Sequence, residues 1–243
     1  MSQLFKLAYG KGFLDLSLDE KHFDVTTLIP GNQAGLDMPR ERFRERASHP
    51  TGVLPLADLA AKKDKSSPKV VIVISDHTRP VPDHLLVPWI VDQIGAKDEN
   101  VTILVGTGSH RPPSNDELLR MLGQDNLDRF RVMSHDCTDS SRLAAVGTTI
   151  CGGICRLNRT YCEADIRIAT GFIEPHFFAG FSGGAKAIMP GIAGIETIRH
   201  FHRAKLIAHP GVTWGETADN PLLNLAREVV SFLPPDFIVN VSL

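Results

Sequence analysis

The chain has 243 residues, of which 42% are hydrophobic and 22% charged, so it can bury a substantial core as one large domain or two small ones. Its 26 basic and 28 acidic residues give a net charge of −2, which lacks the basic excess typical of nucleic-acid partners. The sequence shows neither a signal-peptide pattern nor an apolar run of the ~18 residues that a membrane span requires, so we expect a cytoplasmic protein without a membrane partner.

The first predicted elements are a hairpin and a helix. Residues 5–18 alternate apolar and polar side chains around a Gly-Lys-Gly turn, which is typical of a β-hairpin. A polar stretch with helical character follows at 38–50.

Strands and helices then alternate along the chain. Residues 69–76 form a continuous β-branched run, as expected for a strand buried on both faces of a parallel sheet. Ser114 and Glu117 form a capping box that opens a helix. Further strands are predicted at 101–108, 129–136, 165–171 and 235–243, and further helices at 83–96 and 220–233.

This alternation implies βαβ units. The predicted fold is therefore α/β, with a mainly parallel, Rossmann-like sheet flanked by helices. Because the chain ends inside an apparent strand, we expect the sequence to be a truncated part of a longer chain.

The cysteines do not predict a metal site. Cys137, Cys151, Cys155 and Cys162 lack paired Cys-x2-Cys spacing, so we expect reduced, structural thiols. Histidine is more informative, because four of the ten histidines lie between positions 176 and 209.

Polar clusters follow three predicted strands at the point where each strand ends. In open α/β sheets, ligands bind beyond the carboxyl ends of the strands. Asp76 and Arg79 could form a local ion pair, or Arg79 could bind a carboxylate or phosphate. His110 could be a turn histidine or a catalytic one. The three clusters occupy residues 75–80, 106–111 and 171–176.

The stretch 171–202 is the most informative. Gly180, Gly183 and Gly184 surround Ser182, and Lys186 follows, which favours an anion-binding loop. The spacing matches neither a Walker A loop nor a dinucleotide-binding motif. Lys186 is therefore either a phosphate-binding cation or a covalent tether.

Two further histidines follow this loop. His200 and His202 are two positions apart and cannot share one helical face, so we expect at most one to face the site and the other to be solvated.

Taken in order, D-x-T-R-P, G-T-G-x-H-R, P-H-x-x-A-G-x-S-G-G-x-K, P-G-I and F-H resemble the nickel-dependent lactate racemase family. The resemblance covers nearly the whole chain and places it on the N-terminal domain of that family. It implies a smaller C-terminal domain that is absent from this chain.

The resemblance also implies a cofactor. In this family nickel is held by a pyridinium-3-thioamide-5-thiocarboxylic acid mononucleotide, the nickel-pincer nucleotide, attached to a lysine. That lysine matches Lys186, and the nickel-ligating histidine matches His202. The acid/base histidines match His110 and His176. The cofactor-binding positions, besides Lys186, are predicted to be Asp76, His77, Thr78, Arg79, Ser182, Gly183 and Gly184, the last three as a phosphate cradle.

The implied function is racemisation or epimerisation of a 2-hydroxy acid, lactate or a relative, by hydride transfer to the pyridinium ring. Arg79 would bind the substrate carboxylate, and cofactor-maturation proteins would be partners. One alternative is a nucleotide- or cofactor-binding module without turnover. Another is a phosphate-dependent transferase that uses residues 180–186 as an anion loop.

Overall fold

The computed structural model describes residues 2–28, 31, 34–62 and 67–242. The chain divides into two compact units, one ending at Leu36 and the other beginning at Asp37. That residues 1–243 together form one N-terminal domain stays a prediction.

The first unit is the predicted hairpin, which is confirmed. Strands β1 (Ser2–Tyr9) and β2 (Gly12–Asp19) pair antiparallel, with Tyr9 opposite Gly12. Gly10 adopts a φ of 58° in the turn, a conformation that glycine adopts without a steric penalty. Since side chains alternate across a strand, Phe5, Leu7, Leu14 and Leu16 share one face of the ribbon.

The second unit is built on a five-stranded sheet in which every strand pair is parallel, in the order β11-β8-β3-β4-β5. The predicted α/β fold with a parallel sheet is thereby confirmed. The strands are β3 (Val70–Ser75), β4 (Val101–Gly106), β5 (Arg131–Ser134), β8 (Ile166–Phe172) and β11 (Phe237–Val241).

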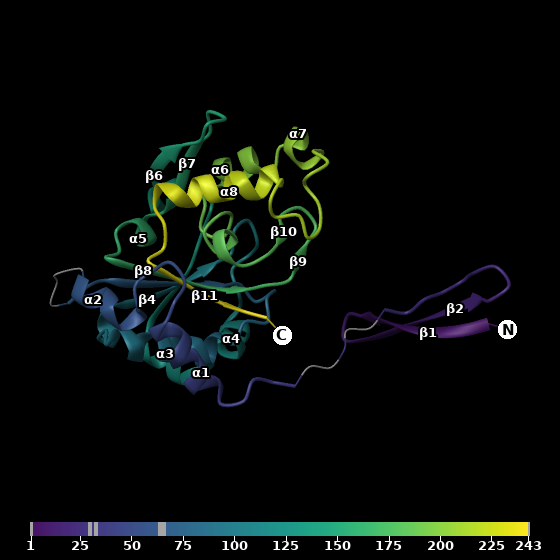
Figure 1. Cartoon of the computed structure of the whole chain (residues 1–243), viewed down its shortest axis with the longest axis horizontal. Coiled ribbons are helices and arrows are strands. Elements are labelled where there is room, and N and C mark those ends of the chain that lie inside the picture. Colours follow the sequence, from purple (N-terminus) through teal and green to yellow (C-terminus); the bar gives the residue numbers. More distant parts are fainter. Residues whose placement is uncertain (1, 29–30, 32–33, 63–66, 243) are drawn as a thin grey trace. The chain divides into compact units, whose positions relative to one another are not determined.

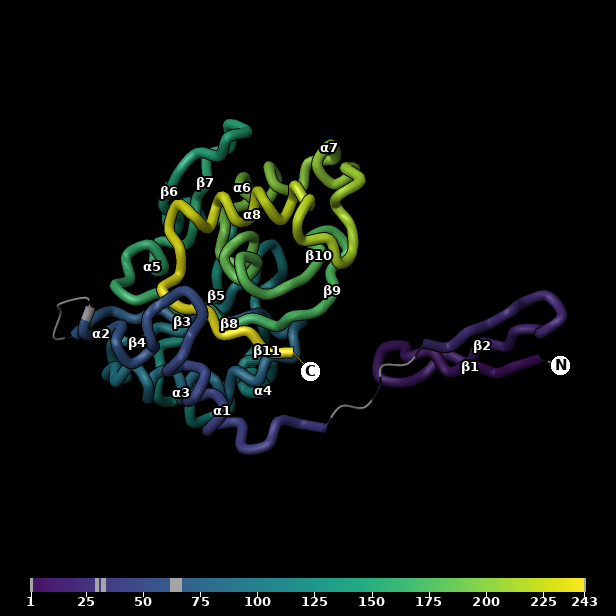
Figure 2. The backbone as a smooth tube through the Cα atoms, viewed as in Figure 1, coloured from purple at the N-terminus to yellow at the C-terminus, as the bar shows by residue number. Residues whose placement is uncertain are grey.

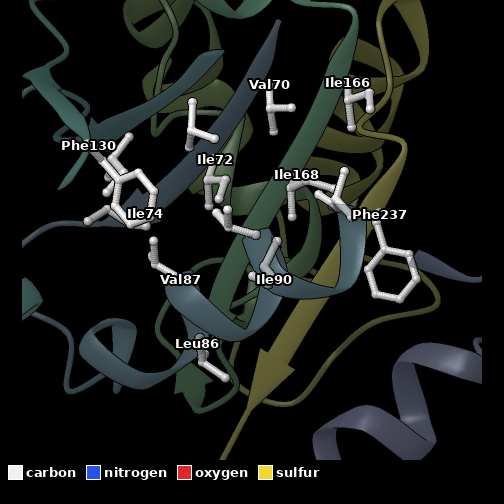
Figure 3. Close-up of a cluster of buried hydrophobic side chains, with 14 of the residues drawn as sticks. Val70, Ile72, Ile74, Leu86, Val87, Ile90, Phe130, Ile166, Ile168 and Phe237 are labelled. Carbon is white, nitrogen blue, oxygen red and sulfur yellow. The ribbon is translucent and has the colours of Figure 1, made fainter. Parts of the chain in front are cut away.

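Apolar side chains cover both faces of the sheet, which explains the unbroken hydrophobic run of β3. Val70, Ile72 and Ile74 point into one core, where they meet Val87 and Ile90 (Figure 3). The intervening residues, 71 and 73, point into a second core on the opposite face.

Helices form the outer layers. In Figure 1, α1 (Pro39–Ser48), α3 (Asp83–Ile94) and α4 (Asn115–Arg129) lie on one side of the sheet, and α6 (Ile195–Phe201) and α8 (Pro221–Phe232) lie on the other. The short helices are α2 (Leu59–Lys62), α5 (Arg159–Cys162) and α7 (Ala204–Ile207).

The helix ends follow the sequence signals. Ser114 and Glu117 form the predicted capping box at the start of α4, and Gly95 ends α3 in the left-handed conformation. The helix α4 continues to Arg129, across a non-helical Gly123.

Two pairs of strands add to the predicted elements. Strands β6 (Leu143–Thr148) and β7 (Ile154–Asn158) form an antiparallel hairpin above the sheet (Figure 2). The two-residue strands β9 (Pro175–His176) and β10 (Gly180–Phe181) pair within the 171–202 stretch. All four cysteines are free. Across the part of the chain that the structure describes, no helix combines the length and apolarity of a membrane span.

Candidate active site

One cavity of about 230 Å³ opens at the carboxyl ends of β3, β4 and β8. The loops after these strands supply its walls together with the turn around Lys186 and the end of α6. All the predicted site residues except His77 and Gly184 line this cavity. The predicted residues that line it are Asp76, Thr78, Arg79, His110, His176, Ser182, Gly183, Lys186 and His202. The expected convergence of distant loops on one cavity is thus observed, whereas the role of each residue stays a prediction.

Asp76 and His110 form a carboxylate–imidazole pair. His110 Nδ1 lies 2.6 Å from Asp76 Oδ2, and Thr78 donates its hydroxyl and backbone N–H to Asp76 Oδ1. Burial raises the pKa of Asp76, but the hydrogen bonds from Thr78 and His110 outweigh it and lower the pKa overall. The ionised carboxylate accepts the Nδ1 proton, so the exposed His110 ring presents its Nε2 lone pair as a base.

His176 is held in the other tautomer. Its Nδ1 accepts the backbone N–H groups of Phe178 and Ala179, each at 3.2 Å. Burial, reinforced by the positive charges of Lys186 and Arg79, lowers the pKa of His176 to about 4. The ring is therefore neutral at pH 7, with its proton on Nε2.

Arg79 is paired with Glu174, not with Asp76. Its Nη1 donates to Glu174 Oε1, and both side chains are about one-third exposed. The local Asp76–Arg79 ion pair considered from the sequence does not form; the backbone N–H of Arg79 donates to the Asp76 carbonyl instead. The rest of the guanidinium fork lies at the cavity wall and can bind an anion.

Glu174 is the residue that sequence reasoning missed. It was noted as part of the third strand-end cluster but given no role. Its backbone is fixed by Ser182, whose N–H donates to the Glu174 carbonyl and whose hydroxyl accepts the Glu174 N–H. An acidic residue two positions before His176 was the available signal.

Lys186 extends from a short 3₁₀ turn, Gly184–Ala187, into the cavity. Burial and the neighbouring charge of Arg79 lower its pKa to about 7, although Glu174 opposes this shift. About half of the amines are therefore uncharged at pH 7.

The glycine-rich turn around Ser182 is closed by internal hydrogen bonds. The Gly184 N–H donates to Asn240 Oδ1, and the Ser182 hydroxyl donates to the Phe172 carbonyl. The predicted phosphate cradle therefore lacks free donors at Ser182 and Gly184 in this conformation. The lack of free donors also argues against the alternative of a phosphate-dependent transferase that uses residues 180–186 as an anion loop.

His202 and His200 face different surroundings, as their spacing predicts. His202 lines the cavity, and its Nδ1 donates to the Ile198 carbonyl at 2.9 Å, so its Nε2 carries the free lone pair. The expectation that His200 is solvated is wrong. Its ring packs where a Cβ on Gly153 would lie, and its Nε2 is buried with no hydrogen-bond partner.

His77 does not line the cavity, and its predicted cofactor-binding role stays a prediction. Its Nε2 lies 3.8 Å from Glu117, which also binds the Arg111 guanidinium through both carboxylate oxygens. In the described ranges, no group of three or more His, Cys, Asp or Glu side chains is placed to hold a metal ion.

Comparison with known proteins identifies the family of this chain. Residues 9–215 match the family model of the lactate racemase N-terminal domain. The chain belongs to this family.

Two relatives are named lactate racemase. The protein from Thermoanaerobacterium thermosaccharolyticum is 36% identical over 220 residues, which cover 89% of this chain and 51% of the relative. The protein from Lactiplantibacillus plantarum is 37% identical over 206 residues, covering 84% of this chain and 48% of the relative. The chain thus spans about half the length of these relatives.

Solved structures agree on the fold. The lactate racemase apoprotein from T. thermosaccharolyticum superposes with a TM-score of 0.81 at 33% identity, over 99% of this chain and 56% of that one. A Thermotoga maritima protein matches with a TM-score of 0.67 at 23% identity, over 84% of this chain and 51% of its own, which supports the fold alone.

Proposed function

We propose that this chain carries the catalytic site of a racemase or epimerase of a 2-hydroxy acid, lactate or a relative. One observation supports the proposal most strongly: an arginine, two histidines in opposite tautomers and a partly uncharged lysine line a single cavity with His202. Family membership and the two relatives named lactate racemase are consistent with it.

The residues present fit the nickel-pincer nucleotide. Lys186 offers a partly uncharged amine for covalent attachment, and His202 offers a free Nε2 whose tautomer is fixed by a backbone carbonyl, the usual arrangement of a metal-ligating histidine. When bound, the nucleotide supplies a pyridinium ring that accepts and returns a hydride. Cofactor-maturation proteins are the partners that this proposal requires.

Arg79 binds the substrate carboxylate and so fixes which end of the acid lies near the histidines. Glu174 occupies one side of the guanidinium, so the remaining N–H groups are available for the substrate. A charge-assisted bond of this kind contributes roughly 1.5–3 kcal/mol.

The two histidines have different starting roles. His110 accepts the hydroxyl proton on Nε2, and Asp76 stabilises the imidazolium that forms. His176 begins as an Nε2–H donor toward the substrate oxygen. For His176 to accept a proton there, its ring must first be released from the two backbone N–H groups. With a histidine on each side of the substrate, the oxygen on C2 can exchange its proton in either orientation of the acid, so both enantiomers can form.

The test is racemisation of L-lactate in D₂O by protein produced together with the maturation proteins. Hydride transfer returns the original C2 hydrogen, so the D-lactate formed should carry no solvent deuterium at C2. Lys186→Ala should abolish racemisation, whereas Lys205→Ala, at an exposed lysine of α7, should not. Deuterium at C2, or full activity in Lys186→Ala, would contradict the proposal.

A further inference from the structure

Lys186 and Arg79 line the same small cavity, which gives the unmodified protein a pair of groups with complementary chemistry. A primary amine attacks a carbonyl carbon, and a guanidinium binds a carboxylate. A small molecule carrying both groups side by side is a 2-oxo acid.

The amine is in the state that such chemistry requires. Burial and the charge of Arg79 together lower the pKa of Lys186 to about 7, although Glu174 opposes the shift. At pH 7 its uncharged fraction is about 10³-fold larger than that of an ordinary lysine. Desolvation beside another cation is an established way to make a lysine nucleophilic. The charged and titratable groups lining the cavity with it are Asp76, Arg79, His110, His176 and His202.

The occupant is restricted by size and charge. The cavity of about 230 Å³ admits a short acid, and Glu174 uses only one side of Arg79. A ketone without a carboxylate could react with the amine but would form no ion pair with Arg79, so it should bind more weakly.

We propose that unmodified Lys186 condenses reversibly with short 2-oxo acids such as pyruvate to form an imine, with Arg79 binding the carboxylate. The lysine nitrogen forms the bond to the carbonyl carbon, and the carbonyl oxygen leaves as water with both hydrogens of the amine. No oxidant or reductant takes part. The proposal does not rest on the racemase function, because it concerns the free amine alone.

The experiment traps the imine with borohydride. The unmodified chain is incubated with pyruvate at about pH 7, reduced, and analysed by intact mass and peptide mapping. We expect one reduced adduct per chain, on the peptide containing Lys186. Trapping should be half-maximal near pH 7, in line with the pKa of Lys186. Lys186→Arg keeps a positive charge but cannot form the adduct, whereas the exposed-site variant Lys205→Arg should be trapped like the parent.

Arg79 is tested separately. Arg79→Gln should raise the pyruvate concentration needed for half-maximal trapping about 10- to 100-fold, the change expected for the loss of one charge-assisted hydrogen bond. Acetone, which lacks a carboxylate, should be trapped weakly by the parent. Arg79→Gln should affect acetone trapping only through the pKa of Lys186, and therefore less than it affects pyruvate trapping. The proposal is overturned if adducts spread over the surface lysines, if Lys186→Arg is trapped like the parent, or if pyruvate and acetone behave alike.

Discussion

The His110 ring is hydrogen-bonded to Asp76, a residue 34 positions earlier in the chain. The carboxylate is buried, whereas the imidazole is exposed, so we infer that Asp76 acts by fixing the orientation and tautomer of the ring.

Replacing Asp76 with asparagine removes the charge but keeps the size. We predict that Asp76→Asn lowers racemisation by the matured protein about 10²- to 10⁴-fold, the usual contribution of a general acid or base. The ¹⁵N shifts of the His110 ring should show that protonation is no longer confined to Nδ1. Unchanged activity with a changed tautomer would show that Asp76 does not act through His110.

At the level of single residues, the sequence predicted most of the cavity lining but not its hydrogen bonds. Arg79, His110 and His176 were predicted because their motifs follow strand ends, whereas Lys186 and His202 were predicted from the stretch 171–202 and the family resemblance. The pairing of Arg79 with Glu174 joins residues 95 positions apart and depends on where β3 and β8 place their loops. The prediction that His200 is solvated was wrong because its ring packs against Gly153. That contact depends on the β6–β7 hairpin, which was not predicted.

Among the helices, α3 carries an unusual carboxyl at its start. Asp83 is 2% exposed and accepts a hydrogen bond from Thr170 of β8 at 2.8 Å. Burial raises the pKa of Asp83 from 3.8 to about 7, while the Thr170 bond opposes the rise. In the unfolded chain this carboxyl ionises near pH 3.8, so between that pH and about 7 unfolding releases a proton and folding stability falls as pH rises.

We predict that Asp83→Asn removes this pH-dependent loss of folding stability, because the amide keeps an acceptor for Thr170 but has no titratable group. Relative to the parent, the variant should gain stability as pH increases from about 5 to 8, by on the order of a few kcal/mol. Urea unfolding across this range measures the difference. The exposed Asp116→Asn should show no such trend, and a difference that is constant with pH would refute the assignment.

Element prediction succeeded where a local signal was strong. The β-branched run of β3 and the capping box of α4 each specify structure within a few residues. Strands β9 and β10 have two residues each and no periodicity to detect. They form because Ser182 bonds back to Glu174, a contact that the sequence pattern does not encode.

In the whole second unit, the parallel sheet places chemically distinct loops at one edge. Strands β3, β4 and β8 are adjacent and parallel, so the loops that carry Arg79, His110 and His176 emerge side by side. The sequence predicted this edge because three of the predicted strands ended in polar clusters. The strand order itself, with β8 inserted between β3 and β11, follows from tertiary packing.

The most direct measurement is peptide mapping combined with metal analysis of protein produced together with the maturation proteins. The account predicts a covalent adduct on the Lys186 peptide and one nickel ion per adduct. His202→Ala should keep the adduct but lose nickel, and His200→Ala should keep both. An adduct on another lysine, or nickel that stays bound in His202→Ala, would contradict the assignment of this cavity.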